Sequence, residues 1–234
     1  GMDVAGTVCA IGEDVDLVWH LADGGWLVRY EPASTVTHES RPTWASARRI
    51  FDYGTSAAAL DRRHPRRLTP ARLSGWNLAI AAVLLSRKPS AAVRTAAALG
   101  VFGVACALLA RTLRSSSVDP RVAPVVVGKT VASDADAAGH LLRREWWPVG
   151  WLALGTALRS RAAVAAAAAM LIPLVREWRS RRPAVDLPRY LALRLIEDAA
   201  YGTGVIAGAI AGRRAAVLLP RARLPYLPRR KPAS

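Results

Sequence analysis

Cysteine is nearly absent from this 234-residue chain, which contains only Cys9 and Cys106. Two cysteines so far apart match no zinc-ligand spacing and exclude a disulfide-rich scaffold, so the chain is typical of a reducing compartment. The sequence also lacks a P-loop, a zinc-finger pattern and a Ser-His-Asp spacing. Residues 1–16 lack the basic start of a secretory signal peptide and carry acidic residues instead.

Acidic residues are scarce, because 17 Asp and Glu stand against 33 Lys and Arg, for a net charge of +16. Residues 1–61 hold nine acidic and four basic residues, whereas residues 62–234 hold eight acidic and 29 basic ones. A basic balance of this size is also found in nucleic-acid-binding proteins. We disfavour that class, because the arginines alternate with apolar runs and 52% of the chain is hydrophobic. The composition indicates an acidic enzyme fragment joined to a basic, apolar remainder.

No charge-free apolar run reaches the length of about 20 residues that a membrane-spanning helix needs. The basic part instead contains five such runs of 13 to 16 residues. They are Leu73–Ser86, Thr95–Ala110, Trp146–Leu158, Ala162–Val175 and Ala199–Gly212. Arginine side chains at both ends can extend a run by snorkelling, so Thr95–Ala110 is the best candidate for a span. We expect these helices to be membrane-embedded or interfacial, with the basic residues against anionic lipid headgroups.

Glycine recurs every four residues in the last apolar run, at Gly204, Gly208 and Gly212. In a membrane this spacing gives a small-residue face that lets another helix approach closely. In water each glycine would weaken the helix by about 1 kcal/mol relative to alanine, so the pattern favours a lipid setting. Tryptophans near the apolar runs fit either an interfacial aromatic belt or an ordinary core. They are Trp76, Trp146, Trp147 and Trp151.

Three segments connect or follow these runs. Trp44–Arg63 predicts an amphipathic helix on the membrane surface, and Ser115–Asp136 predicts a polar loop that contains Pro and Ser. Pro220–Ser234 holds four prolines and five basic residues, which predicts a disordered or lipid-bound tail.

A short amphipathic helix is predicted over Glu13–Asp23, with Glu13, Asp16, His20 and Asp23 on its polar arc. Asp14 breaks the pattern, because it falls within the apolar arc at the first turn. A carboxylate on the inward side of a helix N-terminus is held in its charged form yet partly sheltered, as a general base in a cleft must be. The alternative is a first-turn acid that accepts hydrogen bonds from free backbone N–H groups.

The residues around this helix carry a family resemblance. Gly24-Gly25 predicts its end, and strands are predicted over Trp26–Tyr30 and Ser34–His38. The run from Gly12 to Pro32, with the acidic pair that opens the helix and the words G-W-L-V-R-Y-E-P and His38, resembles glycosyltransferase family 2. The words R-R-I-F-D-Y-G-T-S-A-A and R-H-P, at residues 48–58 and 63–65, are similar to the mycofactocin-system glycosyltransferases of actinobacteria.

The resemblance implies roles for individual residues. Asp14 matches the family's base, which deprotonates the acceptor hydroxyl in an inverting transfer. His38 lies at the spacing where some members place a divalent-metal ligand, although a strand-end histidine bonded to a backbone carbonyl is the alternative. Binding of acceptor or donor is expected from five residues. They are Glu13, Asp16, Trp19, Arg48 and Arg49.

Two alternatives concern these residues. Arg48 and Arg49 could equally form a solvated face or contact phospholipid. Asp14-Val15-Asp16 spells the D-x-D metal motif of nucleotide-sugar enzymes, but on a regular helix the two carboxylates lie about 200° apart and cannot clamp one ion.

The expected fold is mixed: the C-terminal remnant of a GT-A α/β domain, with one helix and two strands, followed by a mainly α-helical membrane-associated region. The boundaries are 1–39 for the GT-A end, 40–70 for the interfacial helix, 71–219 for the apolar helices and 220–234 for the basic tail. Family members place the nucleotide-binding units well before the base, whereas only 13 residues precede Asp14 here. We therefore expect the C-terminal portion of a glycosyltransferase, inactive alone, at the cytoplasmic side of the cell membrane.

The resemblance also implies partners: a nucleotide-sugar donor with a divalent metal (Mg or Mn), which would need the upstream half, and a hydroxyl acceptor, the mycofactocin redox cofactor. Membrane lipids are expected as a further partner, and nucleic acid is not. A non-enzymatic basic membrane scaffold is the alternative function, because the donor-binding half is missing from this sequence.

Overall fold

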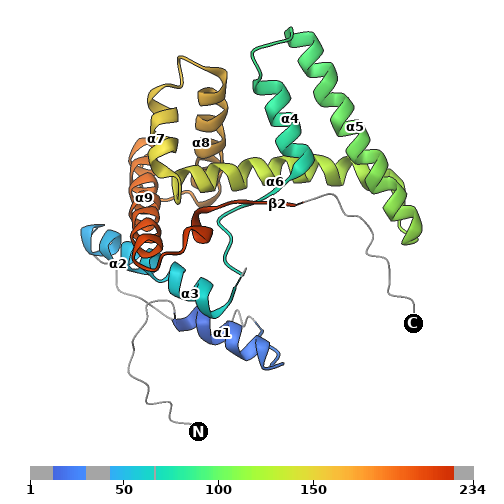
Figure 1. Ribbon diagram of the computed structural model, residues 1–234. Coiled ribbons are helices and arrows are strands. Elements are labelled where there is room, and N and C mark those ends of the chain that lie inside the picture. Colours follow the sequence, from blue (N-terminus) through green and yellow to red (C-terminus); the bar gives the residue numbers. More distant parts are fainter. Residues whose placement is uncertain (1–12, 30–42, 66, 224–234) are drawn as a thin grey trace. The chain divides into compact units, whose positions relative to one another are not determined.

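The computed structural model describes residues 13–29, 43–65 and 67–223, and these residues are mainly helical (Figure 1). In chain order the elements are α1 (Glu13–Asp23), α2 (Thr43–Thr55), α3 (Ala57–Arg63), β1 (Arg72–Ser74), α4 (Gly75–Leu85), α5 (Ala91–Ser115), η1 (Pro120–Val122), α6 (Ala123–Arg143), α7 (Trp147–Gly155), α8 (Arg161–Arg181), α9 (Leu187–Ala211), η2 (Ala215–Leu218) and β2 (Arg221–Arg223). The two strands pair in parallel, with Arg72 opposite Arg221 and Ser74 opposite Arg223.

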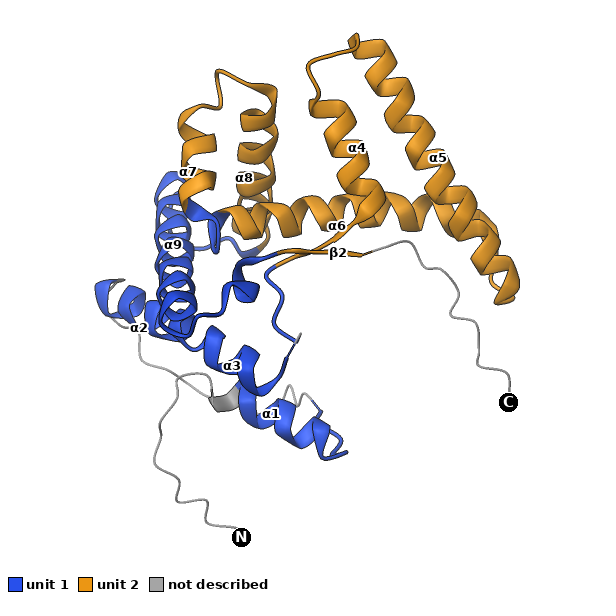
Figure 2. Ribbon diagram, in the orientation of Figure 1, with its two compact units in different colours: residues 1–70, 143–147, 181–219 blue, residues 71–142, 148–180, 220–234 orange. Residues whose placement is uncertain are grey.

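The chain forms two compact units, shown in different colours in Figure 2. Unit 1 contains residues 1–70, 143–147 and 181–219, and unit 2 contains residues 71–142, 148–180 and 220–234. Each unit is therefore assembled from distant parts of the chain. The segment 71–219, expected to be one region of apolar helices, is divided between the two units.

The predicted helix over residues 13–23 is confirmed, and so is its glycine stop. Gly25 has a φ of 81°, and its N–H donates to the carbonyl oxygen of Ala22 at 3.2 Å. The N–H of Trp26 reaches back to the carbonyl oxygen of Leu21 at 3.0 Å, which completes a Schellman motif.

The strand expected directly after this stop is wrong over the residues that the structure describes. Residues 26–29 are exposed and belong to no strand. A strand needs a partner whose N–H and C=O groups complete a ladder, and within the described ranges these residues have none. The second expected strand, at 34–38, lies outside the described residues. The expected helix is observed, and that it belongs to a GT-A remnant remains a prediction.

Unit 1 is organised by the close contact of α2 with α9. A methyl group added at Gly204 would lie 2.0 Å from the carbonyl oxygen of Phe51, and one at Gly208 would lie 2.4 Å from that of Thr55. The glycine spacing of α9 therefore does allow close helix approach, as predicted. That this contact forms in lipid remains a prediction.

The segment expected as a single helix over residues 44–63 is two helices, α2 and α3, separated at Ser56. The Ser56 hydroxyl donates to the carbonyl oxygen of Tyr53 at 2.7 Å, a local bond that competes with helix continuation. The break allows both helices to follow α9: α2 contacts it through Gly54, and Ala57 of α3 joins a small core with Val205 and Ala209. One side of the expected interfacial helix is thus covered by protein.

Unit 2 contains the pair α4 and α5, which pack side by side (Figure 1). The loop expected over residues 115–136 is wrong beyond its first residues, because η1 and α6 occupy 120–143. Pro120 and Pro124 lie at helix starts, where a missing N–H costs nothing, so proline here begins helices instead of excluding them. The expected disordered tail is also corrected at residues 221–223, which form β2.

Among the described helices, α5 alone is long and apolar enough to cross a membrane. It contains the run predicted as the best spanning candidate. Length and composition support this, and membrane insertion itself remains a prediction.

Candidate functional site

Helix α1 contacts the rest of unit 1 through its polar side. Asp16 and Trp19 are partly buried, whereas Leu17 is 60% exposed and Val15 and Leu21 are each 38% exposed. The expectation that the apolar arc faces inward therefore holds only for Trp19 among the described residues of that arc. The physical reason is that the polar side is held by charged contacts to residues 63–67, while no described segment covers the apolar side.

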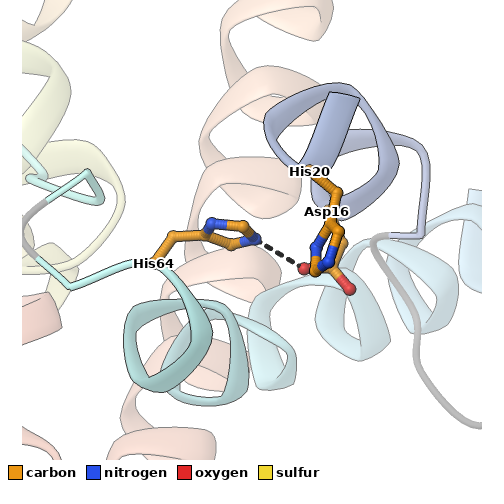
Figure 3. Close-up of side chains that lie close together, drawn as sticks. All are labelled: Asp16, His20 and His64. Atoms are coloured by element: carbon orange, nitrogen blue, oxygen red, sulfur yellow. Dashed lines mark hydrogen bonds and ion pairs between the residues drawn. The ribbon is translucent and has the colours of Figure 1, made fainter. Parts of the chain in front are cut away.

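An alternating chain of charges makes this contact. The Asp16 carboxylate accepts a hydrogen bond from Arg63 and lies 2.8 Å from Nε2 of His64 (Figure 3). The other ring nitrogen of His64, Nδ1, lies 3.4 Å from the carboxylate of Asp23, which also pairs with Arg67. Residues more than 40 positions apart in the chain are thereby joined.

His64 is the centre of this cluster. Its side chain is only 4% exposed, and the backbone N–H of the residue bonds the carbonyl oxygen of Leu60 at 2.8 Å as the C-cap of α3. The ring meets Trp19 edge-on, with 5.2 Å between centroids, and the Arg67 guanidinium lies 5.8 Å from the Trp19 ring centroid. The hydrogen bond to His64, together with the bond and charge of Arg63, lowers the pKa of Asp16 against the opposing effect of burial.

Three side chains of this cluster have the geometry of metal ligands. One carboxylate oxygen of Asp16 and one ring nitrogen each from His20 and His64 lie within 4.8 Å of one another. Asp16 and His20 are one turn apart on α1 and both border an open groove of about 500 Å³. Leu17, Leu21, Gly24 and Trp26 complete the groove, so a polar edge meets an apolar floor.

The structure brings together some of the residues predicted from the sequence. Asp16 and Trp19 belong to the cluster, although for different contacts than expected. Arg48 and Arg49 are exposed on α2, where Arg49 Nε donates to the Tyr53 hydroxyl at 2.8 Å. The predicted roles of Arg48 and Arg49 remain predictions.

Three predicted residues cannot be located in this way. Glu13 and Asp14 belong to α1, but their side chains lie outside the described residues, as does His38 altogether. The roles of Asp14 as base and His38 as metal ligand remain predictions.

Sequence reasoning missed His64, which holds the cluster together. The signal was present in two places, because Asp16, His20 and Asp23 share the polar arc of the helix and the word Arg63-His64-Pro65 is part of the family resemblance. What the sequence did not show is that the two segments meet.

Comparison with known proteins indicates the class first: this chain is similar to a glycosyltransferase. The relative is the pre-mycofactocin glycosyltransferase of Mycobacterium tuberculosis, which is 32% identical over 222 residues in each of two strains. The matched region covers 91% of this chain and 46% of the relative. The predicted resemblance to the mycofactocin-system glycosyltransferases is confirmed.

This chain thus spans about half the length of the curated relatives that it matches. No protein-family model matches the chain. No solved structure matches it either.

Proposed function

We propose that this chain forms part of a membrane-associated inverting glycosyltransferase of family 2 that acts on a mycofactocin precursor. The similarity to the pre-mycofactocin glycosyltransferase along 91% of the chain is the observation that supports this function. The sequence contains no P-loop, zinc-finger pattern or Ser-His-Asp spacing that would favour a different chemistry.

In the proposed reaction Asp14 is the general base. Its carboxylate takes the proton from the acceptor hydroxyl as the oxygen attacks the anomeric carbon, on the face opposite the departing nucleotide diphosphate. The new glycosidic bond forms as the bond to the diphosphate breaks, so the configuration inverts and no second carboxylate nucleophile is required. Glu13, Asp16, Trp19, Arg48 and Arg49 are proposed to contact acceptor or donor.

A divalent cation (Mg or Mn) would neutralise the departing diphosphate. Of the chain's own residues, His38 is proposed as a ligand to it. The Asp16, His20 and His64 cluster is a poor fit to this ion, because two imidazoles replace the oxygen ligands that Mg²⁺ prefers.

Donor binding is proposed to need a further nucleotide-sugar-binding part, corresponding to the rest of the relatives' length. The exposed apolar side chains of α1 and of the segment after it support this, because Leu17 of α1 is 60% exposed and Trp26 and Leu27, which follow the helix, are 71% and 76% exposed. Apolar surface of this extent beside a polar cluster is typical of a docking face. In an assembled enzyme, this contact would place α1 between the two parts.

Attachment to the cytoplasmic side of the cell membrane is proposed for the same protein. Helix α5 is long and apolar enough to span, and the net charge of +16 favours anionic headgroups.

Reconstitution tests the function. The purified chain is incubated with sugar nucleotides and pre-mycofactocin, alone and together with the remaining part of the M. tuberculosis relative. We expect no transfer by the chain alone, transfer by the pair, and a loss of about 10²- to 10⁴-fold in rate for Asp14→Asn. Asp136→Asn, an exposed acid on α6, is the matched control and leaves the rate unchanged.

Two outcomes would contradict the proposal. Turnover by the isolated chain would remove the need for a second part. A pair that assembles on membranes but transfers no sugar would instead support the non-enzymatic scaffold.

A further inference from the structure

The cluster at the contact of α1 with the end of α3 contains two imidazoles and one carboxylate within reach of a single point. Asp16 and His20 share one side of α1, and His64, at the end of α3, faces them (Figure 3). We propose that Asp16, His20 and His64 bind a zinc-type divalent transition metal. The inference stands on this geometry and does not depend on the proposed glycosyl transfer.

The distances suit a metal of this size. Zn²⁺ takes nitrogen and carboxylate oxygen ligands at about 2.0–2.2 Å, so ligand atoms around one ion lie about 3 to 3.5 Å from each other. The Asp16 oxygen lies 2.8 Å from His64 Nε2, and all three ligand atoms lie within 4.8 Å of one another. Small side-chain rotations are therefore sufficient to surround an ion.

The hydrogen bonding of His64 points to a cation at its Nε2. A neutral imidazole has one N–H and can donate to one carboxylate only, whereas an imidazolium donates from both ring nitrogens. Both ring nitrogens of this buried side chain face carboxylates, with Nε2 at 2.8 Å from Asp16 and Nδ1 at 3.4 Å from Asp23. A metal at Nε2 takes the place of the second proton, because Nδ1–H then donates to Asp23, the carboxylate–histidine–metal arrangement that orients metal-bound histidines.

The donor set decides the class of metal. Two imidazoles with one carboxylate suit zinc and its neighbours in the first transition row, whereas Mg²⁺ and Ca²⁺ prefer oxygen ligands. Three protein ligands also leave a fourth position for water or a substrate oxygen. His20 is exposed and both α1 ligands border the open groove, so that position is accessible.

The competing explanation is a purely ionic contact, in which Arg63 and Arg67 neutralise the two acids. Their side chains are 51% and 38% exposed, and ion pairs at such exposure contribute little to stability. Arg63 pairs with one Asp16 oxygen while His64 faces the other, so the arginine can stay in place when a metal binds. The metal would join α1 to residues more than 40 positions later in the chain.

Titration of the metal-free full chain with Zn²⁺, followed by calorimetry, tests the proposal. We expect one equivalent to bind, and Co²⁺ to give the visible absorption of a tetrahedral site. His20→Ala, at an exposed position, should weaken binding at least 10-fold without loss of helix content by circular dichroism. Asp23→Asn should weaken it about 10- to 100-fold through the orientation of His64.

His140→Ala in unit 2 is the matched control and should leave the affinity unchanged. Unchanged affinity in folded His20→Ala would overturn the proposal. So would loss of binding in His38→Ala while His20→Ala and His64→Asn bind as before, because the metal would then belong to another site.

Discussion

Helices α5 and α9 have the same length, 25 residues, and both are apolar and contain glycine, yet they have different surroundings. Gly204 and Gly208 of α9 are buried against the α2 backbone, whereas nothing lies within 4 Å of a methyl group added at Gly100 or Gly103 of α5. Leu99 of α5 is 65% exposed.

Their charged residues differ in the same way. Asp198 of α9 is paired with Arg143 at 2.9 Å, with both side chains almost fully buried. The charge near the start of α5, Arg94, is satisfied locally, because its guanidinium donates to the carbonyl oxygen of Pro89 at 2.7 Å. Helix α9 is thus adapted to a protein neighbour, whereas α5 keeps apolar side chains exposed, and that a lipid bilayer covers them remains a proposal. Equal length and similar composition do not distinguish the two helices. What distinguishes them is whether their glycines and charged side chains contact another helix.

The largest expected effect is removal of the buried acid of α9. Asp198→Ala breaks the buried ion pair with Arg143 and should lower the free energy of unfolding by about 3–5 kcal/mol. Thermal unfolding followed by circular dichroism measures this. Glu197→Ala is the matched control, because its pair with Arg194 is partly exposed and should contribute about 1 kcal/mol or less. Equal losses at the two positions would contradict the assignment of α9 to a packed interior.

The next prediction tests whether a lipid bilayer surrounds α5. If α5 spans a bilayer as proposed, Leu99→Arg places a charge in hydrocarbon at a cost of about 3 kcal/mol and should reduce the membrane-bound fraction strongly. Flotation with vesicles measures that fraction. Ile210→Arg, at a 74% exposed position near the end of α9, should change it much less. A membrane-bound fraction unaffected by Leu99→Arg would remove α5 as the span.

The contrast between the helices was partly predictable from the sequence. Periodic glycines on α9 and the flanking arginines of Thr95–Ala110 are local patterns. The first led to a correct expectation of close approach, and the second led to the described helix that is long and apolar enough to span, whose insertion remains a prediction. The break at Ser56 and the helix over 123–143 were not predicted. Proline and serine are common at both ends of helices, so their positions in the sequence do not show whether one helix ends or the next begins.

The candidate site was less predictable. The sequence placed Asp16, His20 and Asp23 on one arc, and this helix is confirmed. It did not predict that this arc meets His64, because amphipathic periodicity carries no information about a contact that depends on long-range folding. In this short helix, charged contacts hold the polar side against residues 63–67, and the described chain leaves most of the apolar face uncovered.

A smaller effect concerns the glycines themselves. Gly204→Ala would put a methyl group 2.0 Å from the Phe51 carbonyl oxygen, so α2 and α9 must separate, at a cost of roughly 1–3 kcal/mol. Gly103→Ala in α5 meets no neighbour and should stabilise that helix by up to about 1 kcal/mol through helix propensity. The two substitutions thus have opposite signs, and the midpoint of thermal unfolding reports both. A destabilising Gly103→Ala would show that α5 also has a close neighbour.

The smallest effect depends on pH and concerns Glu145, which is buried near Asp198. Burial raises the pKa of Glu145, Arg144 opposes the rise, and Asp198 adds to it. Because the folded state binds this proton more tightly, stability should fall as pH rises from the ordinary glutamate value of about 4.5 through the raised value. Glu145→Gln should remove this fall and stabilise the protein at neutral pH.

Asp16 provides a control of opposite sign. Its pKa is lowered, so its contribution to stability is present above pH 3.8 or so and is lost as pH falls through the folded-state pKa. Unfolding midpoints are measured in the presence of a chelator from acidic to neutral pH. At neutral pH we expect the midpoint of Glu145→Gln to lie above that of the unsubstituted protein and the midpoint of Asp16→Asn to lie below it. Shifts of the same sign would mean that neither carboxylate acts through its own charge.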